Sequence, residues 1–160
     1  MNRKILVRAL GLGLAAVLAS IGMVAATPGS GATATTFSRG TLDAGIKVYT
    51  PDLKFATRDE IDVVTQTITI TPGGQTGWHS HPGPVIVTIA AGTMTFYDGD
   101  DASCARTTYA TGDSFVDRGG GHVHNARNEG ATDLVLYATY LLPVGAGLRT
   151  DAANPGTCGS

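Results

Sequence analysis

Short runs in which apolar and polar residues alternate make up most of the chain beyond residue 36. These runs are rich in β-branched residues and are separated by clusters of Gly, Pro and Asp, while an apolar spacing typical of helices is almost absent. The pattern predicts strands at 36–42, 46–50, 61–71, 75–81, 84–91, 93–98, 105–109, 113–117, 122–128 and 132–142. Many short strands at this spacing favour an all-β fold, a jelly-roll β-barrel of antiparallel strands whose closure hides the sheet edges.

The first 26 residues have a different pattern. Three basic residues precede an apolar run at 9–26, which closes on small residues. This order predicts a signal peptide over residues 1–26, cleaved after Ala26 or, as the alternative, after Ala34. An uncleaved membrane anchor is the other interpretation, because eighteen apolar residues can nearly span a bilayer. The abundance of Gly and Ala makes the run only mildly hydrophobic, so we expect a secreted or cell-envelope protein with no stable membrane anchor.

The rest of the chain has room for one domain. A chain of 160 residues is long enough for one compact core and too short for two of ordinary size. Residues 27–36 are small and polar, which indicates a flexible leader. We therefore expect a single domain with a C-terminal tail over residues 37–160.

The charge balance argues against a nucleic-acid partner. Removing the signal peptide takes three of the eleven basic residues and leaves eight against thirteen acidic ones, a formal charge of −5. No basic run remains in the exported part, so nucleic acid is not an expected partner. A small-molecule ligand or substrate is expected instead. Pairing of barrel edges in a homodimer is a further interpretation.

The two cysteines, Cys104 and Cys158, both lie in the exported part. Because that compartment permits disulfides, we predict that they pair and tie the C-terminal tail to a loop in mid-chain. Two free thiols are the alternative.

The four histidines come as two pairs, His79 with His81 and His122 with His124. In a strand, residues two apart point to the same face, so each pair can direct both imidazoles into one space. Imidazole is a good ligand for late first-row metals, which makes a metal site the favoured interpretation. The alternative is a polar patch in which the histidines are hydrogen-bonded strand residues.

Two polar residues accompany the histidine pairs. Gln75 shares the strand parity of His79 and His81, and Asn128 shares that of His124. Both are candidates to orient a bound water or a ligating imidazole. Capping a turn is an equally good interpretation of each.

The spacing of these residues resembles two sequence motifs of the cupin superfamily, across residues 60–142. The first motif, Gly, five residues, His-x-His, then Glu and Gly, is matched by Gly73, His79, His81 and Gly92, with Val85 at the glutamate position. The second motif is matched by four residues, with Arg118 in place of its proline and one extra residue before the histidine: Gly112, Gly120, His124 and Asn128.

The resemblance implies a cupin-type jelly roll that holds a divalent transition metal, one of Fe, Mn, Ni, Cu or Zn, through His79, His81 and His124. Family members with these histidines usually add the glutamate, a position that Val85 vacates here. Water could fill the gap, and so could His122, either as a ligand or as a near neighbour. No carboxylate is placed near the site by either motif, so an ion bound only by neutral imidazoles would keep its charge of +2.

The walls around such a site should be apolar. Val85, Val87 and Ile89 share one parity, and Phe96, Phe115 and alternate residues of 134–142 add to the wall. Plain core packing is the other role for these residues. A small organic molecule would suit a space of this kind.

Three functions are consistent with these features. The first is an exported metal-dependent cupin enzyme, dioxygenase-like, acting on a small organic molecule; its catalytic residues beyond the metal ligands are unknown. The second is a non-catalytic secreted barrel that holds a metal or a small ligand, a use that the same fold also serves. A weaker third is a scaffold for oligomers. The sequence identifies neither the metal nor the substrate.

Overall fold

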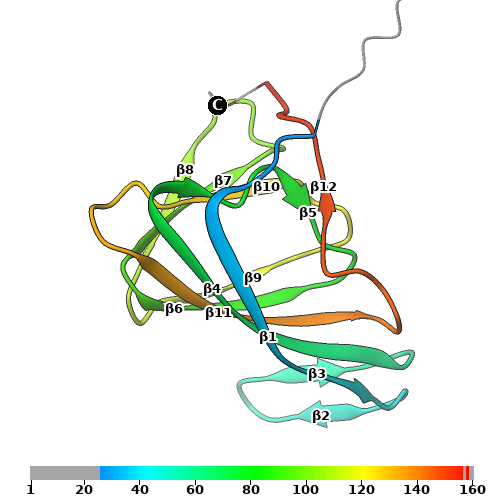
Figure 1. The fold of residues 1–160 in the computed structure, drawn as a ribbon. Coiled ribbons are helices and arrows are strands. Elements are labelled where there is room, and N and C mark those ends of the chain that lie inside the picture. Colours follow the sequence, from blue (N-terminus) through cyan, green and yellow to red (C-terminus); the bar gives the residue numbers. More distant parts are fainter. Residues whose placement is uncertain (1–25, 157, 159–160) are drawn as a thin grey trace, which may run out of the picture.

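The computed structural model describes residues 26–156 and Cys158, so that the predicted signal peptide lies, apart from Ala26, outside the described residues. Antiparallel strands curve into a barrel with open ends, and β2 and β3 form a separate hairpin beside it (Figure 1). This confirms the predicted all-β jelly roll. The strands are β1 Ser30–Leu42, β2 Lys47–Tyr49, β3 Lys54–Ala56, β4 Ile61–Gln75, β5 His79–Ser80, β6 Val85–Ala91, β7 Thr93–Asp98, β8 Arg106–Ala110, β9 Ser114–Asp117, β10 His124–Arg127, β11 Leu134–Pro143 and β12 Thr150–Asp151.

One wall of the barrel is the run of paired strands β4, β11, β6 and β9. Along β6 and β11 every second residue is buried, as expected for strands with one face on a core. The buried residues of this wall meet those of β7 and β10 in one cluster, which fills the barrel interior: Val64, Ile70, Val85, Val87, Ile89, Met94, Ala126, Leu134, Leu136, Ala138, Tyr140 and Leu142. The histidines lie at one end of this apolar cluster.

The first strand begins earlier than predicted. Residues 30–36, expected within a flexible leader, form the start of β1, which pairs with β4 along its length from Ser30↔Gln75 to Leu42↔Ile61. Almost every residue of β1 is exposed, so backbone hydrogen bonds to β4, and not burial of side chains, hold it in place. The composition of small polar residues correctly indicated little burial, but it could not indicate this pairing.

The predicted strand at 75–81 is wrong in most of its length. β4 continues to Gln75, the chain then bends at Gly77, whose φ is +73°, and only His79–Ser80 form β5. Only glycine fits at this bend, because the segment at Thr27 passes close by and a Cβ on Gly77 would lie 2.2 Å from the carbonyl oxygen of Thr27. The short strands β3 and β12 were not predicted either.

The predicted disulfide between Cys104 and Cys158 is confirmed. Cys158 packs in a second buried cluster with Trp78 and Tyr97. The tail before it forms β12, which pairs with β5, so the C-terminal segment is tied to the strand that carries His79. No segment of the described chain forms a helix that could cross a bilayer.

Candidate metal centre

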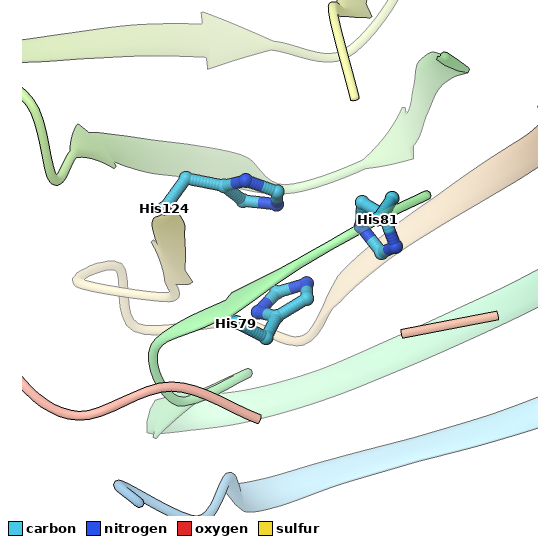
Figure 2. Close-up of side chains that lie close together, drawn as sticks. All are labelled: His79, His81 and His124. Carbon is cyan, nitrogen blue, oxygen red and sulfur yellow. The ribbon is translucent and has the colours of Figure 1, made fainter. Parts of the chain in front are cut away.

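Three of the four histidines converge at one end of the barrel interior (Figure 2). His79 on β5 lies directly opposite His124 on β10, and His81 follows two residues after His79. Their ring centroids are 4.4 Å apart for His79 and His124, 4.8 Å for His79 and His81, and 5.1 Å for His81 and His124. One nitrogen from each ring lies within 4.8 Å of the others, and each residue is at most 6% exposed. The predicted face parity thus brings the two histidine pairs of the sequence together.

A backbone carbonyl lies beside Nδ1 of each of the three rings, and for His124 it is that of His122, at 3.3 Å. The Nδ1 of His79 lies 2.8 Å from the carbonyl oxygen of Gly77, and the Nδ1 of His81 lies 2.7 Å from that of Leu148. Because a carbonyl only accepts, each Nδ1 carries the proton, which leaves the Nε2 lone pair free. A carbonyl behind a histidine is the usual arrangement that orients a metal ligand.

The histidines are held neutral. Burial, with smaller contributions from the neighbouring imidazoles, lowers the pKa of His79 to about 2, and burial lowers the pKa of His124 to about 4. Burial also lowers the pKa of His81. All three imidazoles are therefore deprotonated at neutral pH, which is the form that binds a metal.

The histidines line a small cavity of about 50 Å³. Its walls confirm part of the predicted apolar lining, and Ile89 is buried in the core without reaching the cavity. The lining residues are Thr76, His79, His81, Val85, Val87, Met94, Phe96, Phe115, Asp117, His124, Ala126, Leu136 and Tyr140. A larger groove of about 390 Å³ lies elsewhere, around β3 and the turn at 82–84, and contains none of the histidines.

One carboxylate in this lining was not predicted. Asp117, the last residue of β9, is 4% exposed and lies against three of the histidines. The signal for it was present in the sequence, because Asp117 has the parity of Phe115, which was assigned to the wall. Neither motif includes this position, so motif spacing did not indicate it.

His122 lies beside the cluster and is engaged by carboxylates. Its Nε2 is 2.8 Å from Oδ1 of Asp98, its Nδ1 is 3.4 Å from Oδ1 of Asp117, and its ring stacks on His124 with centroids 5.7 Å apart. This arrangement places it as the near neighbour that the sequence analysis considered, with both nitrogens occupied.

The two predicted polar companions hold the backbone and the neighbouring strands. Gln75 accepts a hydrogen bond of 2.6 Å from the side chain of Asn125. Asn128, which is fully buried, donates to the carbonyls of Ile70 and Thr132 and accepts from the backbone N–H of Gly130. Neither residue lines the cavity. The contacts of Asn128 are those of a turn cap, whereas Gln75 is bonded to a side chain of β10.

The contacts of Asn128 make a testable difference between its two interpretations. Asn128→Ala removes a donor from the buried carbonyl of Ile70 and from the partly buried carbonyl of Thr132, so we expect a loss of about 2 kcal/mol in the free energy of unfolding. Under conditions in which the variant is fully folded, its metal affinity should stay within about threefold of that of the unmodified chain. If Asn128 oriented a ligand, its loss would instead weaken binding tenfold or more. Urea unfolding and metal titration of the same variant measure both. A fall in affinity without a fall in stability would contradict the capping role.

Comparison with known proteins identifies a family match in the middle of the chain. Residues 66–140 match the family model described as the cupin domain. No curated protein matches the sequence. Among solved structures, a cupin domain from Bordetella pertussis is 21% identical, with 62% of this chain and 94% of that chain covered and a TM-score of 0.44. A Klebsiella pneumoniae protein with a double-stranded β-helix domain is 24% identical, with coverages of 56% and 74% and a TM-score of 0.47. The oxalate decarboxylase of Lactobacillus farciminis is 20% identical, with coverages of 56% and 26% and a TM-score of 0.49.

Proposed function

Because this chain carries a cupin domain over residues 66–140, we propose that it is an exported metal-binding cupin whose His79, His81 and His124 hold one divalent transition metal ion. The observation that carries the proposal is the convergence of three buried, neutral imidazoles on one space. Nitrogen donors of this kind suit Fe, Mn, Ni, Cu or Zn. The disulfide supports export, because such bonds persist in oxidising compartments.

The residues around the ion would limit what can reach it. A divalent ion held there would supply Lewis-acid activation of a small ligand. The apolar walls, among them Phe96, Phe115 and Leu136, would exclude bulk water from that ligand. The hydroxyl of Tyr140 donates a hydrogen bond to Gln66, and burial raises the pKa of Tyr140 to about 12. Its side chain is therefore an uncharged part of the cavity wall.

The volume of the cavity bears on whether the protein is an enzyme. A dioxygenase-like reaction on a small organic molecule is the enzymatic form of the proposal. Its alternative, a non-catalytic barrel that holds a metal or a small ligand, is favoured by the cavity of about 50 Å³. Pockets that enclose drug-sized molecules are usually about 300 Å³ or more, so an organic substrate would need to be very small or to open the barrel.

Loss of the metal is the expected result of His79→Ala. With one of three imidazole ligands removed, metal content should fall from about one ion per chain to below about 0.2 in protein purified from its native compartment. His122→Ala is the comparison variant, because both nitrogens of His122 face carboxylates, and it should lose much less metal than His79→Ala. Elemental analysis of the three proteins makes the measurement. Equal metal content in His79→Ala and the unmodified chain would refute the proposed site.

Oxygen uptake then separates the two forms of the proposal. The metal-loaded protein is offered a panel of flavonols, diketones and aromatic acids under air. Turnover with any of them supports the enzyme, and no turnover with the metal fully loaded supports the binding barrel. The mass of the mature chain, recovered outside the cell, tests export and shows whether cleavage follows Ala26 or Ala34.

A further inference from the structure

The acid that the first cupin motif lacks has a counterpart on the neighbouring strand. In the pairing of β6 with β9, Val85 lies directly opposite Asp117 and Val87 opposite Phe115. Residues opposite one another in an antiparallel pair project to the same side of the sheet, so Asp117 enters the barrel at the level of the vacated glutamate position. Both Val85 and Asp117 line the cavity that contains the three histidines.

The two oxygens of Asp117 have different surroundings. Oδ1 accepts a hydrogen bond of 3.2 Å from the backbone N–H of Gly119 and faces Nδ1 of His122 at 3.4 Å. Oδ2 is buried and finds no hydrogen-bond donor among the described residues. It lies 3.8 Å from Nε2 of His81 and 3.6 Å from Nδ1 of His124. One oxygen is therefore held by the loop, and the other is directed at the histidine cluster.

A buried carboxylate oxygen with no partner is costly, because burial removes the water that solvated it. The side chain of Asp117 is only 3% exposed, so little of it contacts bulk solvent. A cation beside His81 and His124 would provide the missing partner. Such a cation would have one anionic oxygen within reach beside the neutral imidazoles, a combination of donors that suits the same divalent metals.

We propose that Oδ2 of Asp117 is a ligand of the metal, and that a carboxylate supplied from β9 takes the place of the glutamate that Val85 replaces on β6. This inference rests on the proposed function, because it needs the metal that the histidines hold. It also changes the charge expected at the site from +2 to +1 once the carboxylate is counted.

The test compares two aspartates that both contact His122. Asp117→Asn keeps the shape of the side chain and removes its charge, while Asp98→Asn does the same to the carboxylate that binds Nε2 of His122. Affinity is measured by competition between each apo protein and a chelator for Co²⁺. Asp117→Asn should weaken binding by more than about 100-fold, beyond the 10- to 100-fold that loss of an outer partner costs, and Asp98→Asn by less than about tenfold.

Spectroscopy of the Co²⁺ proteins distinguishes a ligand from a residue that only positions His124. The visible spectrum of Asp117→Asn should change, because an anionic oxygen ligand is lost from the Co²⁺ ion, whereas a positioning role would lower affinity with the spectrum unchanged. Unchanged coordination overturns the inference. Unchanged Co²⁺ binding in His79→Ala overturns the proposed function itself, so the two failures are distinct.

A second variant carries the test if Asp117→Asn does not fold. Val85→Glu combined with Asp117→Ala moves the carboxylate across the strand pair to the motif position, with the deleted side chain making room for the added one. Its Co²⁺ affinity should return to within about tenfold of the unmodified chain, against the loss expected in Asp117→Ala alone. Failure of the glutamate to restore affinity would count against the inference.

Discussion

Replacing Cys104 and Cys158 together with serine should lower the free energy of unfolding by about 4 kcal/mol, because the disulfide closes a loop of 54 residues and restricts the unfolded chain. The loss should be larger than that of a typical core substitution of one methylene group. Urea unfolding of the metal-free protein measures it, with unmodified protein under non-reducing conditions as the reference. A change below about 1 kcal/mol would show that the cross-link adds little to the folded state.

The same substitution should also weaken metal binding. In the segment that precedes Cys158, Asp151 pairs with His79, and the N–H of Ala152 donates to the carbonyl of Trp78. Loosening the tail therefore removes backbone support next to a histidine of the cluster. We expect a several-fold loss of metal affinity in the double serine variant, a size in line with loss of outer support. Metal titration well below the unfolding midpoint separates this effect from unfolding.

The histidine cluster could be predicted because strand parity acts over short distances in the sequence. His79 and His81 both enter the site, whereas of the second pair only His124 does, because His122 lies before β10 and faces carboxylates. The pairing of β5 with β10 had to be supplied by the fold. The motif spacing supplied that pairing through the resemblance. Neither histidine pair alone could predict how close the two pairs lie in the barrel.

The place of Asp117 beside the histidines could not be predicted from strand parity and motif spacing. Its relation to Val85 depends on the register of β6 against β9, which joins residues 32 apart in the sequence. A search restricted to motif positions finds only the valine. Parity with Phe115 indicates that Asp117 faces inward, but which side chain it then meets is decided by the strand pairing.

β1 and β12 were missed or shortened for a related reason. Both are largely exposed strands, so neither carries the apolar alternation on which the strand prediction relied. They are held by backbone hydrogen bonds to β4 and β5. Which strand edges are free to accept such a partner is decided only when the sheet is assembled. Exposed edge strands rich in small polar residues are therefore the least visible part of this fold in its sequence.

Three backbone segments meet closely beside the metal centre, and two glycines make the approach feasible. A Cβ on Gly83, in the turn between His81 and Val85, would lie 2.0 Å from the carbonyl oxygen of Leu141. A Cβ on Gly119, two residues after Asp117, would lie 2.1 Å from the carbonyl oxygen of Gly83. These contacts involve backbone atoms, so a side chain at either position would have to push a whole segment aside.

Gly119→Ala should therefore destabilise the protein and disturb the site together. We expect a loss of about 2–5 kcal/mol, the sum of overpacking and of the left-handed backbone at φ +63°. Gly120→Ala is the matched control, because Gly120 has φ +64° but open space around its Cβ, and it should lose only about 1–2 kcal/mol. The methyl group added at position 119 would press on the turn that follows His81 and on the loop that holds Asp117. Metal affinity should therefore fall in Gly119→Ala and stay unchanged in Gly120→Ala. Equal losses of stability in the two variants would mean that backbone conformation alone, and not the close approach to Gly83, requires glycine here.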